Sequence, residues 1–287
     1  MSDTRPLISF QGAPGAWSDM ACRDAYPEMT PMPCPTFPEA FAAVRDGTAE
    51  LSMIPIENSV AGRVADIHHL LPESGLHIIG EYFLRVNFHL FAVPGAQLED
   101  ITHVHSHIHA LPQCSNFITE HGFEAVVHAD TAGASADVAK WNDHTQAAIS
   151  SDLAGELYGL VSLARDVENA DHNTTRFIVM ARDAIYPDPA TPDLITTFVF
   201  RVRSLPAALY KALGGFATNG INITKLESYL SGDFVVAQFY ADVEGHPQHS
   251  GLKNALEELR FFTHSIDILG TYPAHRYRLE QMVRQNA

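Results

Sequence analysis

Short apolar runs alternate with amphipathic segments through most of the chain. The apolar runs have the length of buried strands, and in the segments between them apolar residues recur every three or four positions, as on one face of a helix. The first strand and helix are predicted at residues 7–10 and 18–26, and the next helix and strand at residues 38–45 and 51–56. The alternation ends with a strand at residues 176–180. It predicts an α/β fold.

Residues 184–193 interrupt this alternation, because they contain three prolines and no periodicity, as is typical of a linker. Beyond them the order strand, helix, strand, strand, helix, strand predicts a ferredoxin-like βαββαβ module. These elements are expected at residues 196–202, 205–218, 223–229, 234–243, 252–260 and 265–272. We therefore divide the chain into a large domain at 5–183, the linker, a small domain at 194–274 and a polar tail at 275–287.

The length of the chain agrees with this division, and its charge excludes some classes of function. The 287 residues exceed the roughly 100 to 200 that one domain usually contains. A formal charge of −16 opposes binding to nucleic acid or to an anionic membrane. An anionic small substrate would be repelled too, so it needs a local group of hydrogen-bond donors. Three cysteines without CxxC spacing and a start without a signal-like segment lead us to expect a cytoplasmic protein.

Polar residues gather where predicted strands end, which is where α/β proteins bind ligands. The turn at residues 11–18 contains two glycines and could offer backbone N–H groups to an anion, or it could be an ordinary connection to the next helix. Glu57, Asn58 and Ser59 follow a buried strand and could bind a polar substrate or cap the following helix. Both interpretations remain open for each segment.

A third and a fourth segment carry titratable or charged side chains. Histidines occupy alternate positions from His103 to His109 and would share one face of a strand. No carboxylate or cysteine stands at a defined distance from them, so we predict no metal site there. Arg176 follows the polar loop at residues 171–175 and could form paired hydrogen bonds with a substrate carboxylate, or a salt bridge at the domain surface.

Taken in order, these segments resemble the prephenate dehydratase family over nearly the whole chain. The most specific match is Asn-Thr-Thr-Arg-Phe at residues 173–177, which has the form NxTRF. The resemblance implies a bilobal catalytic domain like a type 2 periplasmic binding protein, followed by an ACT domain. It also implies catalytic roles at Thr175, Arg176 and Phe177. By the same resemblance, the substrate-binding residues would be Glu57, Asn58, Ser59, Ser106, Gln113 and Thr131.

The family removes CO2 and the ring hydroxyl from prephenate and forms phenylpyruvate on the route to phenylalanine. Aromatisation drives the reaction, so no cofactor is expected. The threonine hydroxyl at position 175 would either hydrogen-bond to the leaving hydroxyl or transfer a proton to it, and the sequence leaves both open. The alternatives are an arogenate dehydratase, whose substrate has an amino group in place of the keto group, and a non-catalytic amino-acid-binding sensor.

Two segments depart from the family pattern. The usual SHPQ is Ser-His-Ile-His at residues 106–109, and the usual ESRP of the ACT domain is Glu-Ser-Tyr-Leu at residues 227–230. The resemblance implies a homodimer or homotetramer with phenylalanine as allosteric ligand at an interface between ACT domains. The alternative is a purely structural dimerisation module. The residues that would bind phenylalanine are Leu209, Asn219, Asn222, Glu227 and Ser228.

Overall fold

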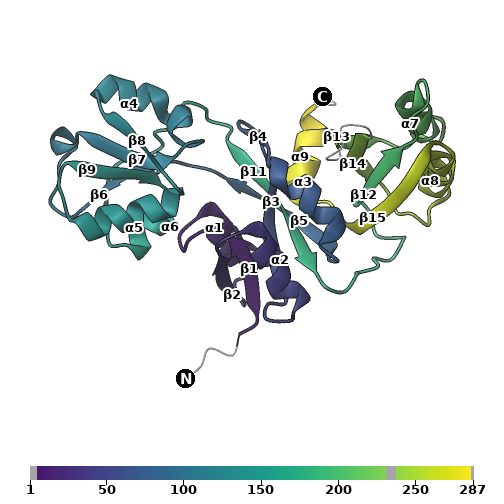
Figure 1. Cartoon of the computed structure of the whole chain (residues 1–287), viewed down its shortest axis with the longest axis horizontal. Helices are drawn as coiled ribbons and strands as arrows, with labels where there is room; N and C mark the ends of the chain where they lie inside the picture. Colours follow the sequence, from purple (N-terminus) through teal and green to yellow (C-terminus); the bar gives the residue numbers. More distant parts are fainter. Residues whose placement is uncertain (1–4, 231–236, 286–287) are drawn as a thin grey trace. The chain divides into compact units, whose positions relative to one another are not determined.

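The computed structural model describes residues 5–230 and 237–285. These residues form two compact units (Figure 1). The first unit comprises Met1–Val64 and Tyr82–Phe177, and the second comprises Ala65–Glu81 and Ile178–Ala287. Strands β5 (His77–Arg85) and β11 (Thr174–Ala181) therefore each begin in one unit and end in the other. Within the described residues, no helix combines the length and apolar character that a membrane span requires.

The first sheet has the strand order β2-β1-β3-β11-β5, with the short β4 paired to β3. Strand β1 pairs in parallel with both β2 and β3, and its Ile8 and Phe10 are completely buried. Helices α1 and α2 pack against β1 and β2, and the Thr36 side chain caps α2 by accepting from the Glu39 N–H. The remaining bounds are β1 (Leu7–Gln11), α1 (Trp17–Ala25), β2 (Thr30–Cys34), α2 (Phe37–Arg45), β3 (Leu51–Asn58) and β4 (Gly62–Arg63).

The second sheet, in the order β10-β6-β9-β7-β8, forms another lobe of the same unit. It is mixed, because β7 runs parallel to β8 and β9 while β6 runs antiparallel to β9 and β10. Its strands are β6 (His89–Ala92), β7 (His103–His107), β8 (Glu124–His128), β9 (Gln146–Ser150) and β10 (Val161–Ala164). Its helices are η2 (Leu98–Asp100), η3 (Leu111–Cys114), α4 (Ser115–His121), α5 (Thr131–Trp141) and α6 (Asp152–Leu157). The predicted two-lobed α/β architecture is confirmed.

The second unit contains an antiparallel sheet in the order β13-β14-β12-β15, and two helices pack against one face of it. This confirms the predicted βαββαβ order, although residues 234–236 of the predicted third strand lie outside the described residues. The core between sheet and helices includes stacked Phe198 and Phe216. The elements are β12 (Leu194–Val202), α7 (Ala208–Thr218), β13 (Ile223–Leu230), β14 (Ala237–Glu244), α8 (Ser250–Phe262) and β15 (Thr263–Pro273).

Polar groups are buried on the other face of this sheet. Glu81 and Asp242 have fully buried side chains, and Arg278 contacts both, at 2.7 Å and 3.7 Å. Arg278 belongs to α9 (Arg276–Gln285), within the stretch predicted as a polar tail. Leu279, Met282 and Val283 give that helix a short apolar stripe, although the stretch is polar overall, and ionic contacts hold its first turn. The helices α3 (Ala65–Leu70) and η1 (Leu71–Glu73) also belong to this unit.

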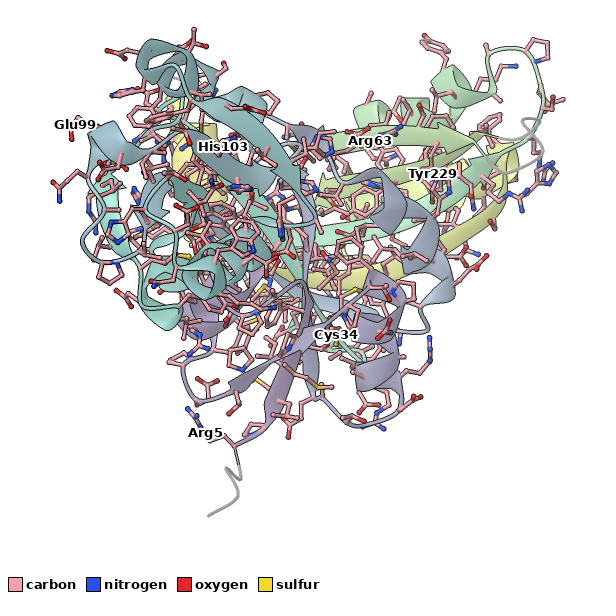
Figure 2. The ribbon with its side chains drawn as sticks, turned by 60° about the vertical axis from the view of Figure 1, so that its left-hand side comes forward. Arg5, Cys34, Arg63, Glu99, His103 and Tyr229 are labelled. Carbon is pink, nitrogen blue, oxygen red and sulfur yellow. The ribbon has the colours of Figure 1, made fainter. Side chains whose placement is uncertain are left out.

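Side chains of α3 reach the small sheet within the second unit. His68 lies edge-on to Tyr240, with ring centroids 5.2 Å apart, and His69 lies edge-on to Tyr229 at 5.1 Å. Tyr229, labelled in Figure 2, stands where the family pattern has arginine, and it is buried. Burial also raises the pKa of its hydroxyl to about 12. The departure at position 229 therefore places an aromatic ring contact where the family pattern has a charge.

Candidate active site

A cavity of about 300 Å³ in the first unit brings together all four polar segments of the sequence. The turn before α1 contributes Trp17 and Ser18, and the end of β3 contributes Asn58. Residues from β7 to η3, the start of α5, and the strand β11 complete its lining. The first turns of α1 and α5 reach the cavity, and helix N-termini carry the partial positive charge that favours an anion.

Side chains of β11 alternate between the cavity and the opposite face, as the two-residue period of a strand requires. Asn173, Thr175 and Phe177 line the cavity, and Arg176 does not. The Arg176 side chain is 2% exposed, and its Nη1 lies 3.0 Å from Oε1 of Glu57. Of the two interpretations of Arg176, the salt bridge is therefore observed, between a buried guanidinium and a Glu57 side chain that is 32% exposed.

The amide of Asn58 determines which way the hydroxyl of Thr175 can donate. Its Oδ1 accepts the backbone N–H groups of Val60 and Ala61 at 2.9 and 2.8 Å, which fixes the orientation of the amide. Its Nδ2 then donates to Oγ1 of Thr175 at 2.9 Å and to Oδ1 of Asn173 at 2.7 Å. Because the Thr175 oxygen accepts from Asn58, its own hydrogen remains available for a ligand in the cavity.

The same network continues into the second lobe. Asn173 is 1% exposed, and its Nδ2 donates to Oε1 of Gln113 at 2.8 Å. Gln113 in turn donates from Nε2 to the backbone carbonyl of His109 at 2.6 Å. Each amide has a defined donor and acceptor side, so the direction of every bond follows from the two N–H groups that point at Asn58. The network thus orders side chains of β3, β11 and η3 around the cavity.

The remaining predicted substrate-binding residues divide between the cavity and its supports. Thr131 lines the cavity at the first position of α5. Ser59 does not line it; its hydroxyl donates to the carbonyl of His172 and accepts the N–H of Thr174, so it holds the loop that precedes β11. Ser106 is completely buried and donates to the carbonyl of Ile149. Direct substrate contacts by these two serines stay a prediction.

An aromatic wall was not singled out in the sequence. The rings of Trp17 and Phe88 meet edge to face with centroids 4.8 Å apart, and both line the cavity together with Phe177. Trp17 follows directly on the glycine turn, a position that marks it as a candidate for the site. Phe88 stands between two lobes that only the tertiary structure identifies, and nothing local distinguishes it from a core phenylalanine.

The alternate histidines do not form a shared site. His103 lies 3.4 Å from Glu124, and His105 hydrogen-bonds to Gln146, whereas His107 and His109 line the cavity. Within the described residues, no group of three or more histidine, cysteine or acidic side chains is placed to hold a metal ion.

The residues predicted to bind phenylalanine lie on α7, on the turn after it and on β13. The Asn219 amide donates to the carbonyl of Gly215 and to Glu258, and the Asn222 amide donates to Glu244. Leu209 packs on the core of the second unit. Glu227 and Ser228 belong to β13, an outer strand of its sheet. An outer strand can be extended by another chain, so this placement is compatible with a site between two copies.

Comparison with known proteins identifies close relatives. A family model for prephenate dehydratase matches residues 8–185. A protein of Komagataeibacter europaeus named bifunctional N-acyl-homoserine lactone acylase/prephenate dehydratase is 52% identical over 95% of this chain and 97% of its own length. Arogenate dehydratase/prephenate dehydratase 2 of Arabidopsis thaliana is 37% identical over 94% of this chain and 73% of its own. The structure of prephenate dehydratase from Arthrobacter aurescens in complex with L-Phe has a TM-score of 0.85 and 31% identity, covering 93% of this chain and 90% of that one.

Proposed function

The chain belongs to the prephenate dehydratase family, and from that premise we propose that it converts prephenate to phenylpyruvate. In this reaction the ring carboxylate leaves as CO2, its bonding electrons complete the aromatic ring, and the ring hydroxyl leaves with one proton as water. The product contributes to phenylalanine biosynthesis. The gain of aromaticity supplies the driving force, so the protein has to bind, orient and polarise the substrate.

One observation carries this proposal. The side chain of Thr175 lines the cavity, and its hydroxyl oxygen accepts a hydrogen bond from the Asn58 amide. The Thr175 hydrogen is then directed to the leaving hydroxyl of the substrate. A threonine hydroxyl is a weak acid near neutral pH, far from the matched pKa that proton transfer favours. Its contribution is therefore a hydrogen bond to the oxygen on which negative charge develops.

The remaining lining suits the other half of the reaction. The edge-to-face rings of Trp17 and Phe88, together with Phe177, form an apolar wall for the six-membered ring. A carboxylate held against such a wall is poorly solvated, which favours its loss as neutral CO2. The N-terminal turns of α1 and α5 offer a complementary place for the carboxylate that stays.

Replacement of Thr175 tests the proposal by ultraviolet detection of phenylpyruvate. Thr175→Val keeps the shape and removes the hydroxyl, and it should lower kcat about 100- to 1,000-fold, the usual effect of losing one donor to a developing charge. Thr175→Ser keeps the hydroxyl and should retain most of the activity. A folded valine variant with wild-type kcat would contradict the role of Thr175. A folded wild-type protein that binds an amino acid and forms no phenylpyruvate would contradict the dehydratase function itself.

Arogenate is the alternative substrate, because the Arabidopsis relative carries both dehydratase names. The two substrates differ only where one has a keto group and the other an ammonium group. Asp130 lines the cavity, and its Oδ1 caps α5 by accepting the Gly133 N–H at 2.6 Å. A carboxylate that caps a helix with one oxygen can still accept from an ammonium group, so Asp130 does not decide between the two substrates. We favour prephenate because the family model that matches the chain is that of prephenate dehydratase. The ratio of kcat/KM for the two substrates measures this preference, and a ratio in favour of arogenate would reverse the assignment.

A second activity is suggested by the name of the Komagataeibacter relative, which includes N-acyl-homoserine lactone acylase. We propose that this chain also hydrolyses such amides, adding one water and releasing a fatty acid and homoserine lactone. The apolar wall of the cavity supports the proposal, since an acyl chain needs an apolar surface. Release of homoserine lactone from a purified preparation tests it. Equal release by Thr175→Val would separate this reaction from the dehydratase site, and no release would refute it.

The relatives also support a proposal about regulation by phenylalanine. We propose that phenylalanine binds between the β13 regions of two copies in a homodimer or homotetramer, close to Asn219, Asn222 and Glu227. The Arthrobacter relative was solved with L-Phe, which supports the ligand. Calorimetric titration with phenylalanine and the mass in solution by light scattering test the proposal. A monomer, or the absence of a saturable signal at millimolar phenylalanine, would favour a purely structural module.

A further inference from the structure

Helix α6 contacts the turn that precedes α1, and the two lie side by side within the first unit (Figure 1). Residues 11–12 and 16–18 on this turn line the cavity, whereas the carbonyls of Pro14 and Gly15 are bound by side chains at the two ends of α6. Among the described residues that line the cavity, none belongs to α6. The helix therefore supports part of the cavity wall from behind.

Two hydroxyl groups hold the turn by its backbone. The hydroxyl of Ser151, the N-cap of α6, donates to the Gly15 carbonyl and accepts the Ala154 N–H at 3.1 Å. The hydroxyl of Tyr158, the C-cap, donates to the Pro14 carbonyl at 3.0 Å. Burial raises the pKa of the Tyr158 hydroxyl, so this donor keeps its hydrogen. Because the two carbonyls are consecutive, these bonds fix the orientation of the chain at this point of the turn.

Gly15 allows the turn to lie directly on α6. Its φ is +89°, a conformation that residues with a side chain rarely adopt. A Cβ at this position would lie 2.7 Å from the Cα of Ala154, a backbone atom that cannot rotate away. From the opposite side, the buried Asp19 accepts the Gly15 N–H at 2.8 Å with Oδ2 and the Arg23 Nε–H with Oδ1. Side chains therefore bind both polar groups of the Gly15 backbone.

Trp17 is the residue of the cavity wall that this arrangement places. Its ring meets Phe88 edge to face, and both Trp17 and Tyr158 pack against the apolar core of the second lobe. The chain that carries Trp17 follows β1 and belongs to the first lobe. The ring thus reaches from one lobe to the other, and its position depends on how the turn is held on α6. A displacement of about 1 Å in a positioning group can slow a reaction about 100-fold.

We propose that Tyr158 is a positioning residue of the dehydratase site, which holds Trp17 in the cavity wall through the Pro14 carbonyl. This inference rests on the proposed dehydratase function, in which the aromatic wall receives the substrate ring and keeps water from the carboxylate that leaves. Tyr158 does not line the cavity and acts through the turn alone. The hydroxyl of Thr175 is held separately, by the Asn58 amide, so it stays in place when the turn moves.

The first experiment compares kcat/KM for prephenate in two variants of this contact. A hydrogen bond between neutral groups commonly changes an equilibrium about two- to tenfold, and Tyr158→Phe should lower kcat/KM about threefold. Gly15→Ala forces the turn away from α6 and should lower it about 100-fold. The matched controls are Tyr186→Phe, at an 86% exposed ring, and Gly122→Ala, at a φ of +69° with nothing within 4 Å of an added Cβ. Both should stay within about twofold of wild type.

A double-mutant cycle tests whether Tyr158 acts through Trp17. In Trp17→Ala the ring that the turn positions is absent, so the further change Tyr158→Phe should have no additional effect on kcat/KM. The same threefold loss in both backgrounds would overturn the inference, because the hydroxyl would then act on a group other than Trp17.

Fluorescence of Trp17 reports its position without any turnover. The chain contains two tryptophans, Trp17 and Trp141, and Trp141 does not line the cavity. The measurements are therefore made in a Trp141→Phe background, where Trp17 is the single emitter. Acrylamide should quench its emission more efficiently in Tyr158→Phe than in the two controls, and more efficiently still in Gly15→Ala.

The combined outcomes separate this inference from the dehydratase proposal. Stronger quenching in both variants of a folded protein that does not turn over prephenate would refute the dehydratase proposal and leave the positioning of Trp17 by α6 in place. Turnover of prephenate with kcat/KM equal to that of the controls would refute the inference alone. A loss of kcat/KM without a change in quenching would also refute it, and a lower Tm with both quantities unchanged would assign Tyr158 a purely structural role.

Discussion

Reversing the hydrogen bond between Asn58 and Thr175 is the sharpest test of the site. In Asn58→Asp the oxygen that accepts the Val60 and Ala61 N–H groups stays, and a second oxygen replaces the nitrogen that now donates to Thr175. An ionised carboxylate only accepts hydrogen bonds. The Thr175 hydrogen would therefore turn toward this carboxylate, 2.9 Å away in the present geometry, and would no longer point into the cavity.

The contacts allow two effects of Asn58→Asp to be estimated, the loss of kcat and the loss of stability. Loss of the donor to the leaving hydroxyl should lower kcat about 100- to 1,000-fold, although the hydroxyl is still present. For stability, Asn173 and Gln113 can both turn over to satisfy the carboxylate, but Gln113 would then place its oxygen against the carbonyl of His109. One hydrogen bond is lost there, which costs about 1 to 3 kcal/mol. The new bond from Thr175 to the carboxylate offsets part of that cost.

Initial rates of phenylpyruvate formation and a thermal melt measure the two effects separately. The variant should melt only a few degrees below wild type, and its activity should recover as pH falls, because a protonated carboxyl can again donate to Thr175. Asn169→Asp is the matched control, since the Asn169 amide donates to Pro112 and Ser115 and does not line the cavity. If Asn58→Asp keeps kcat within about threefold of wild type at neutral pH, the direction assigned to the Thr175 hydroxyl is wrong.

Three further predictions concern stability. Arg278→Met leaves two buried carboxylates without this partner and should lower the free energy of unfolding in urea by about 3 to 5 kcal/mol. Arg276→Met changes a side chain that is 89% exposed and should lower it by under about 1 kcal/mol. Equal effects of the two changes would refute the buried network. Gly155→Ala would place a methyl carbon 2.3 Å from a phenylalanine ring and should lower Tm, while Gly214→Ala, in open space on a helix, should raise it slightly. Burial lowers the pKa of His275, so the stability it contributes is present above pH 6.5 and is lost as pH falls below that value. His275→Asn should flatten this acid dependence in melts, and an unchanged slope would contradict it.

Much of the fold was readable from local pattern. The strand and helix alternation is set by which residues are apolar, and it predicted the α/β fold and the βαββαβ module, while the two lobes were implied by the family resemblance. The polar clusters at the end of β3 and at the start of β11 also marked the site, and these two strand ends meet in the structure, where the Ser59 N–H donates to the carbonyl of Thr174. The period of two in β11 even separates Thr175 from Arg176, which the motif lists together. Applied strictly, that period predicts opposite faces for them.

Other features depended on residues distant in the chain. Helix α9 is polar overall, and it is held through Arg278 by carboxylates nearly 200 and nearly 40 positions away, which no local window contains. The direction of the Thr175 hydrogen follows from backbone N–H groups that point at Asn58, a matter of three-dimensional orientation. What a charged group or a hydrogen-bond donor does depends on the residues around it, and tertiary packing determines which residues those are.

For this protein, the sequence by itself determined the order of elements, the family and the segments that carry the chemistry, because these depend on residue type and spacing. The tertiary structure decided which side chains enter the cavity, which of them stand behind it, and that its ionisable lining consists of Asp130, His107 and His109. The physical reason is that hydrogen-bond direction and the pKa of a buried imidazole depend on distance and burial. Neither quantity exists until the chain has folded.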